Sequence, residues 1–135
     1  MERAKTVVDA SVAIKWFVQE PLSQNAEKIL QEHIEGKRLI FAPDLVIYEV
    51  GNALHFRGLA VEDVKRAFQD MADFQLHIEK ATITLVLNAV RLARSYKLTV
   101  YDAAYAALAE VMGAELITAD EKVSTLPFAR SLGRM

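Results

Sequence analysis

Residues 5–12 read KTVVDASV, an apolar run that stops at Asp9 and leads into a segment with helical spacing. The β-branched residues before Asp9 predict a short buried strand over residues 5–9. The apolar positions that follow predict a short helix over residues 11–18. The junction between strand and helix therefore falls on an acidic residue, beside side chains that belong in a core.

The rest of the chain repeats this alternation of short apolar strands and longer helices. Short apolar runs predict further strands over residues 39–41, 76–78 and 115–118. Helical spacing predicts the other elements, over residues 22–34, 43–57, 61–73, 81–96 and 101–112. Because strands that alternate with helices indicate a parallel sheet covered on both faces, we expect an α/β fold. Its architecture would be a three-layer α/β/α sandwich with a central, mostly parallel sheet.

The composition is that of one compact globular domain. With 135 residues, 53% apolar and 25% charged, the chain can bury a sizeable core, and we expect a single domain over residues 1–135. No stretch approaches the roughly 18 to 20 apolar residues of a membrane span, and Asp9 breaks the first apolar run too early for a signal peptide. We therefore expect a cytoplasmic protein with no membrane partner. The absence of cysteine excludes disulfides, zinc–thiolate sites and thiol nucleophiles.

The charge balance argues against binding to nucleic acid by charge alone. The net charge is −2 and the sequence pI is about 5.9, whereas proteins held on nucleic acid by charge are usually basic. A nucleic-acid enzyme of this composition needs cations that repair the local field, or clustered basic residues. We interpret the candidate basic positions as a solvated helix face and an ordinary tail: Arg91, Arg94, Lys97, Arg130 and Arg134.

Four acidic residues lie against apolar runs, namely Asp9, Glu49, Asp102 and Asp120. Carboxylates are seldom buried unpaired, because an ionised oxygen loses its hydration, and four at the edges of core elements indicate one shared divalent cation. Each also has a simpler interpretation. Asp9 could cap a helix, Asp102 could meet the positive end of a helix dipole, and Asp120 could begin a short terminal helix. Glu49 could pair with a neighbouring lysine or arginine.

Oxygen ligands without nitrogen or sulfur favour a hard cation, Mg²⁺ or Mn²⁺. Ligands of parallel sheets bind beyond the carboxyl ends of the strands, where Asp9 and Asp120 are both expected. Asn52 follows Glu49 by one helical turn and could orient it by a hydrogen bond. One or two such ions can activate water and stabilise the leaving oxygen of a phosphodiester. No cysteine and no G-x-S-x-G pattern offers a competing covalent nucleophile.

The motifs that carry these acids resemble those of the PIN domain family, over essentially the whole chain. They are D-x-S at residues 9–11, E-x-x-N-x-L at 49–54, Y-D-A at 101–103 and T-A-D at 118–120. The size is similar to that of single-domain VapC-type toxin ribonucleases. The resemblance implies a Mg²⁺- or Mn²⁺-dependent endoribonuclease whose metal and catalytic residues are Asp9, Glu49, Asp102 and Asp120. It also implies that Ser11 and Thr118 orient the carboxylates or water.

The resemblance implies partners as well: an RNA substrate, a small antitoxin protein and a second copy of the chain in a homodimer. Two other hypotheses stay open. The first is a PIN-like module that binds protein and does not turn over RNA. The second is an aspartate-based phosphotransfer domain, receiver-like or of the haloacid dehalogenase type, although Ser11 stands where the latter needs a second acid.

Overall fold

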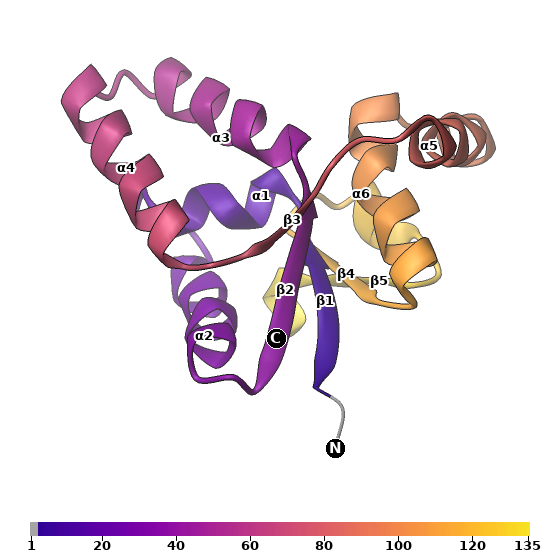
Figure 1. Ribbon diagram of the computed structural model, residues 1–135, viewed down its shortest axis with the longest axis horizontal. Helices are drawn as coiled ribbons and strands as arrows, with labels where there is room; N and C mark the ends of the chain where they lie inside the picture. Colours follow the sequence, from indigo (N-terminus) through magenta and orange to yellow (C-terminus); the bar gives the residue numbers. More distant parts are fainter. Residues whose placement is uncertain (1–2) are drawn as a thin grey trace.

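The computed structural model describes residues 3–135 and contains a five-stranded sheet with the strand order β3-β2-β1-β4-β5 (Figure 1). The strands are β1 (Ala4–Val8), β2 (Arg38–Pro43), β3 (His77–Glu79), β4 (Glu115–Thr118) and β5 (Ala129–Ser131). Every neighbouring pair is parallel. The predicted α/β architecture with a parallel sheet is therefore confirmed.

Helices connect the strands, as a parallel sheet requires. They are α1 (Ala10–Ala13), α2 (Ser23–Ile34), α3 (Leu45–Phe56), α4 (Val61–Asp73), α5 (Ile83–Tyr96) and α6 (Val100–Met112). Three short 3₁₀ segments complete the set: η1 (Ile14–Trp16), η2 (Val123–Thr125) and η3 (Leu132–Arg134). No helix in residues 3–135 has the length and apolar character to cross a membrane.

The central strand β1 supplies both faces of the sheet. Successive side chains of a strand point to opposite faces, so Val7 and Val8 enter different cores, and both are fully buried. Val7 belongs to the larger core, which α6 covers, with α5 packed against α6. Val8 belongs to a smaller core, in which α2 contributes Ala26 and Ile29. These helices and the sheet form the three layers.

Two parts of the chain differ from the expectation. The helix predicted over residues 11–18 is one α-helical turn, α1, that tightens into η1 and ends by Phe17. Strand β5 was not predicted, because it is a three-residue edge strand with Arg130 exposed at its centre and no apolar alternation. Such a strand is defined by its pairing with β4 and not by its own sequence.

The direction of the strand order changes at β1. From β1 the chain runs outward to β2 and β3, and then returns to the other side of β1 as β4 and β5. The carboxyl ends of β1 and β4 therefore lie side by side, with Val8 opposite Ile117. Such a change of direction is where open α/β sheets bind ligands. In Figure 1, α3 and α6 lie on either side of this end of the sheet.

Candidate active site

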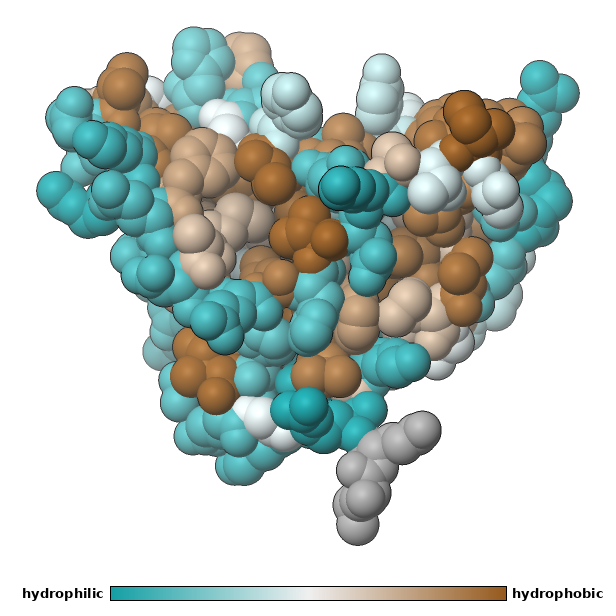
Figure 2. All heavy atoms as spheres, viewed as in Figure 1, coloured by the Kyte–Doolittle hydropathy of each residue, from teal (hydrophilic) through white to brown (hydrophobic). Residues whose placement is uncertain are grey.

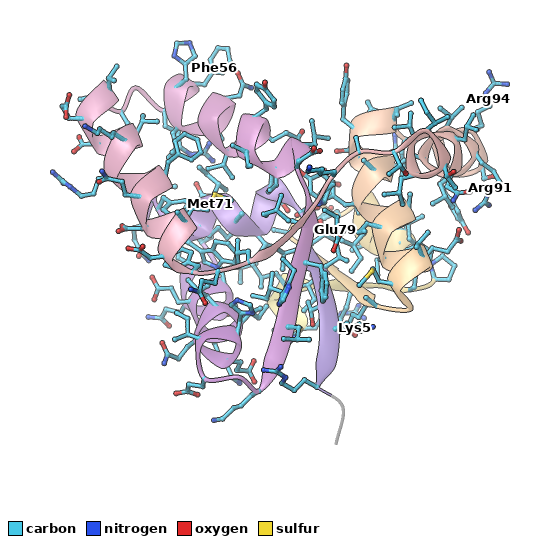
Figure 3. All side chains as sticks on the ribbon, viewed as in Figure 1. Lys5, Phe56, Met71, Glu79, Arg91 and Arg94 are labelled. Atoms are coloured by element: carbon cyan, nitrogen blue, oxygen red, sulfur yellow. The ribbon has the colours of Figure 1, made fainter. Side chains whose placement is uncertain are left out.

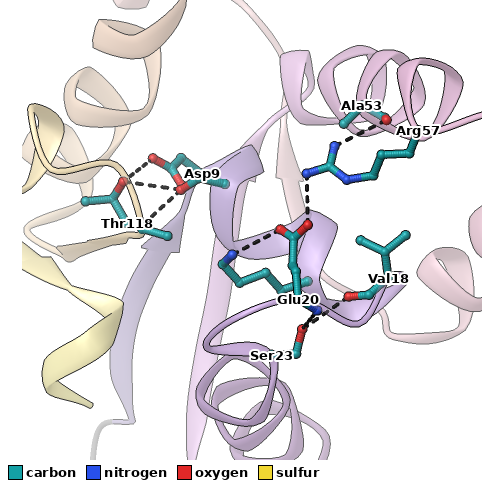
Figure 4. A network of polar contacts seen from close by, with 10 residues as sticks. Asp9, Val18, Glu20, Ser23, Ala53, Arg57 and Thr118 are labelled. Atoms are coloured by element: carbon teal, nitrogen blue, oxygen red, sulfur yellow. Dashed lines mark hydrogen bonds and ion pairs between the residues drawn. The ribbon is translucent and has the colours of Figure 1, made fainter.

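Asp9 follows the last residue of β1 and is 7% exposed. Its carboxylate accepts hydrogen bonds from two hydroxyl groups. Ser11 Oγ donates to Oδ1 at 2.5 Å, and Thr118 Oγ1, at the end of β4, donates to Oδ2 at 2.5 Å (Figure 4). The residues predicted to orient a carboxylate thus contact the first of the four acids, Ser11 from α1 and Thr118 from the end of β4.

Backbone N–H groups fix the direction of these two hydroxyl bonds. Ser11 Oγ accepts from the N–H of Ala119 at 2.9 Å, and Thr118 Oγ1 accepts from the N–H of Asp120 at 3.0 Å. An N–H group can only donate, so each hydroxyl proton remains available to Asp9. The Asp9 side chain does not cap α1, and neither does Ser11, which lies inside that helix. The simpler interpretation of Asp9 as a helix cap therefore holds for its position, since it is the N-cap residue of α1, and not for a side-chain capping hydrogen bond.

Burial raises the pKa of the Asp9 carboxyl group from 3.8 to about 6, because the charged form loses hydration. The bonds from Ser11 and Thr118 oppose this effect, and the nearby charge of Asp120 adds to it. The two hydroxyl donors therefore do not fully replace the lost water.

Glu49 lies on α3, half-buried beside the buried positions Val50 and Leu54. Its Oε1 accepts a hydrogen bond from the hydroxyl of Tyr105 on α6. Asn52, the expected partner, is exposed, and no hydrogen bond joins it to Glu49 within the part of the chain that the structure describes. Because Tyr105 is 56 positions away, helical spacing around Glu49 gave no sign of it.

The charges of two further acids act on Tyr105, which donates to Glu49. Tyr105 is 1% exposed, and burial together with the charges of Glu49, Asp9 and Asp102 raises its pKa, so the phenol stays protonated and donates. Asp102 stands in the first turn of α6, whose N-terminus is capped by Thr99. Burial raises the pKa of Glu49, and repulsion from Asp102 raises it further. Glu49 and Asp102 are thus electrostatic neighbours across α3 and α6.

Asp120 is the most exposed of the four acids and follows β4. Its Oδ1 accepts from the N–H groups of Lys122 and Val123, at 2.8 and 3.1 Å, just where η2 begins. The simpler interpretation, in which Asp120 begins a short terminal helix, is met in part: its carboxylate holds the turn that leads into η2, which itself begins at Val123. Its second carboxylate oxygen is not used in these bonds, and its charge reaches Asp9.

No ion pair neutralises this set in the described residues. The acids that pair with lysine or arginine lie elsewhere: Glu20, Glu32, Glu35, Asp63, Glu110 and Glu115. The expectation that Glu49 could pair with a basic neighbour is therefore wrong for residues 3–135. Four uncompensated carboxylates are the donor set that a hard divalent cation prefers. In their present orientations, no three acidic or histidine side chains between residues 3 and 135 lie close enough to hold an ion.

A pocket of about 460 Å³ opens between α1, α3 and α6, and of the four acids Glu49 lines it, while Ala10 and Tyr101, the chain neighbours of Asp9 and Asp102, also contribute. Its polar lining consists of Ser11, Tyr48, Glu49, Asn52, Arg57 and Tyr101. The basic positions that the sequence singled out lie elsewhere. Arg91 and Arg94 lie at the outer end of α5 (Figure 3), and Arg91 pairs with Glu110 at 2.6 Å. The interpretation of these arginines as a solvated helix face agrees with their exposure.

The fold and these residues define a parallel α/β/α protein with an acidic site where its strand order changes direction. A model of the PIN domain matches residues 6–129, and the chain belongs to the PIN domain family. It is 38% identical over 125 residues to ribonuclease VapC3 of Pyrobaculum aerophilum, covering 89% of this chain and 92% of that relative.

Solved structures show the same fold. The Pyrobaculum aerophilum protein PAE2754 superposes with a TM-score of 0.73 at 25% identity, over 98% of this chain and 94% of that one. A chain of a toxin–antitoxin complex from Klebsiella pneumoniae gives 0.72 at 19% identity, over 94% and 97%. VapC20 of Mycobacterium tuberculosis, a toxin that cleaves the sarcin–ricin loop, gives 0.70 at 18% identity, over 91% and 95%.

Proposed function

We propose that this protein is a metal-dependent endoribonuclease and the toxin of a toxin–antitoxin pair. The observation that carries the proposal is the uncompensated set Asp9, Glu49, Asp102 and Asp120, of which Glu49 lines the pocket, in a PIN domain whose 38% identical relative is a ribonuclease. Cations would offset this negative charge and let an acidic protein approach an RNA phosphate, as its net charge of −2 requires.

The four carboxylates would hold Mg²⁺ or Mn²⁺. Such an ion, when bound, activates water and stabilises the leaving oxygen of the phosphodiester. Asp9 is kept in place by Ser11 and Thr118, so its oxygens need little reorganisation. The Tyr105 hydroxyl holds Glu49 in a fixed orientation on the opposite side. The raised pKa values of Asp9 and Glu49 mean that binding of a cation competes with protons on these two groups.

Cleavage of defined RNA oligonucleotides tests the proposal, with Mg²⁺, Mn²⁺ or EDTA present. Internal cleavage is expected with either metal and none with EDTA. Asp102→Asn removes one carboxylate of the cluster and should lower the rate at least about a hundredfold, the upper range for residues that only support a metal site. Asp73→Asn, at an exposed position of α4, makes the same chemical change away from the pocket and should keep full activity.

Three results would contradict the proposal. If no RNA is cleaved under any metal condition while the protein stays folded, the chain is a PIN-like module that acts through protein contacts. If Asp102→Asn unfolds the protein, Asp102 has a structural role. A stable acyl-phosphate after treatment with a small phosphodonor would instead support phosphotransfer.

The partners proposed with this function are a small antitoxin and a second copy of the chain. The matched chain of the Klebsiella pneumoniae toxin–antitoxin complex supports the first. A largely apolar cavity of about 750 Å³ between α3, α5 and α6 supports the second, and its lining residue Tyr101 is 65% exposed. On α5, the helix that forms one wall, Ile83 and Leu87 are 80% and 64% exposed, and Figure 2 shows apolar surface over this helix. Sedimentation should show a dimer, and Leu87→Lys should weaken it. A wild-type monomer at all concentrations would contradict the homodimer.

A further inference from the structure

The pocket beside the acids carries one basic side chain among its described lining residues, Arg57. It directly follows α3, the helix that also carries Glu49. Eight residues separate the two, which corresponds to about 12 Å along a helix. One wall of the pocket therefore runs from a carboxylate at one end to a guanidinium at the other.

A carboxylate from a distant loop fixes the position of Arg57. Glu20 Oε2 accepts from Arg57 Nη2 at 2.9 Å, and the Ala53 carbonyl accepts from Nη1 at 3.3 Å (Figure 4). The other carboxylate oxygen of Glu20 accepts from Lys15 Nζ at 3.0 Å. Since a guanidinium has five N–H donors, these two bonds leave others free. The Arg57 side chain is 39% exposed, so solvent or a ligand can reach it.

The loop that presents Glu20 is itself held in place. The backbone N–H of Glu20 donates to Ser23 Oγ at 3.0 Å, and the Ser23 hydroxyl donates to the Val18 carbonyl at 3.1 Å. Ser23 is 1% exposed. Arg57 is thus anchored through a tethered loop, and its guanidinium loses little conformational freedom when a ligand binds.

The local charge of this network is positive. Lys15 and Arg57 share the single carboxylate of Glu20, which leaves one positive charge in excess. The Lys15 side chain is only 11% exposed, so Arg57 is the member that faces outward. An excess positive charge on a preorganised guanidinium is suited to a phosphate, which it can bind through two parallel hydrogen bonds.

We propose that this pocket holds the stretch of RNA next to the cleaved bond, with the Arg57 guanidinium bound to a backbone phosphate and Glu20 and Lys15 as its positioning residues. This inference rests on the proposed ribonuclease activity. A polyanionic strand matches both ends of the pocket, because one phosphate can lie at the cation-binding carboxylates while a neighbouring phosphate lies at Arg57. A protein carboxylate would match only the Arg57 end.

We call the proposed contact between Arg57 and a backbone phosphate the anchor. The variant Arg57→Gln tests it through binding and cleavage of one labelled RNA oligonucleotide. Loss of a hydrogen-bonded charge should raise KM about tenfold. Because the contact is made before and during the reaction, kcat should stay within about twofold of wild type. In EDTA, which stops cleavage, fluorescence anisotropy should show a similar rise in Kd. The slope of log Kd against log salt concentration should fall by about 0.7, the value for one phosphate contact to a single strand.

Two further variants make the comparison specific. Arg94→Gln removes the same charge from the outer end of α5 and should leave KM, Kd and the salt slope at wild-type values. Arg57→Lys keeps the charge without the planar guanidinium, so its salt slope should match wild type. Its KM should lie between the values of wild type and Arg57→Gln.

The outcomes separate this inference from the proposed function. Wild-type cleavage together with an unchanged KM and salt slope in Arg57→Gln overturns the anchor and leaves the nuclease intact. The same holds if Arg57→Gln only lowers the melting temperature, since Arg57 is then a structural helix-end cation. If the wild-type protein cleaves no RNA but Arg57→Gln shows the expected loss of binding, the anchor is supported and the nuclease is overturned.

Discussion

Asp9 and Glu20 lie at the two ends of the same short segment, one just before α1 and the other soon after η1, yet their surroundings are opposite (Figure 4). Asp9 accepts from two hydroxyl groups and pairs with no lysine or arginine in residues 3–135, and burial raises its pKa to about 6. Burial acts on Glu20 in the same direction, but the hydrogen bonds and charges of Lys15 and Arg57 outweigh it and lower the pKa of Glu20.

The difference indicates which carboxylate serves the fold. Glu20 is compensated within the chain, so its charge contributes to stability. Asp9 is kept ionisable in a place that penalises its charge, and the fold tolerates that cost. Strongly perturbed carboxylates in a cleft are typical of functional sites, because a bound cation or substrate supplies the missing compensation. If this interpretation is right, substitutions at the two ends of the segment should have effects of opposite sign.

Among substitutions that change the surroundings of Asp9 and Glu20, the largest effect is expected from Thr118→Val, which removes one of the two Asp9 donors at almost constant volume. The Asp9 Oδ2 atom and the N–H of Asp120 both lose a partner. We expect RNA cleavage to fall by about 10- to 100-fold, as for other residues that orient metal ligands. The free energy of unfolding should fall by about 1–3 kcal/mol, because buried polar groups remain unsatisfied. Cleavage rates and urea unfolding measure the two effects.

Thr118→Ser is the matched control, since it keeps the hydroxyl and removes only a methyl group. Activity should stay near the wild-type level, with a modest loss of stability from the buried methyl. If Thr118→Val were as active as Thr118→Ser, the hydroxyl would not support the site.

Asp9→Asn, unlike Thr118→Val, should raise the free energy of unfolding. A pKa shift from 3.8 to about 6 corresponds to a cost of roughly 3 kcal/mol for the charged form in the folded protein. The neutral amide avoids that cost, although it must donate where the carboxylate accepted. We therefore expect a net gain of about 2 kcal/mol at pH 8 in EDTA, at the upper end of the range for single stabilising substitutions. Urea unfolding measures it, and a loss of stability would mean that the ionised carboxylate contributes to the fold.

The fold could be predicted from local pattern, whereas the surroundings of the acids could not. The alternation of strands and helices is visible within a few residues of each element, so the parallel sheet was predicted except for its edge strand β5. The hydroxyl of Thr118 was found because it stands in the same short motif as Asp120. Which face each element presents to the site depends on packing across the sheet.

Long-range partners account for the features that were missed. Tyr105 looked like one more core residue in the run Ala103–Ala109, and only the packing of α6 beside α3 brings its hydroxyl to Glu49. Glu20 and Arg57 are 37 positions apart and belong to no shared motif. Asn52 was chosen as the partner of Glu49 from helical spacing alone, which gives neighbours on one helix and none from another.

The pH dependence of stability should separate the two carboxylates further. Because the folded-state pKa of Asp9 is raised, its protonated form stabilises the protein below about pH 4, and this contribution is lost as the pH rises through about 6. In EDTA, the stability advantage of Asp9→Asn should therefore be largest above pH 6 and should disappear towards pH 4. Urea unfolding of both proteins at several pH values measures this difference. An advantage that does not vary with pH would mean that the charge of Asp9 is not its cause.

The smallest effect is expected from Glu20→Gln, and its sign should be opposite to that of Asp9→Asn. The variant keeps an acceptor for Lys15 and Arg57 but removes the charge they share, and the partly exposed pairs are screened by solvent. We expect a loss of at most about 1 kcal/mol in the free energy of unfolding at pH 7. Because the folded-state pKa of Glu20 is lowered, the wild-type advantage should be present above the ordinary value of 4.5 and lost as the pH falls.

Glu115→Gln, which removes the acid of an exposed pair at 3.5 Å with Arg130, provides the control for a surface charge outside this network. If Glu20→Gln were more stable than wild type, as Asp9→Asn is expected to be, then pairing with Lys15 and Arg57 would not be what distinguishes Glu20 from Asp9.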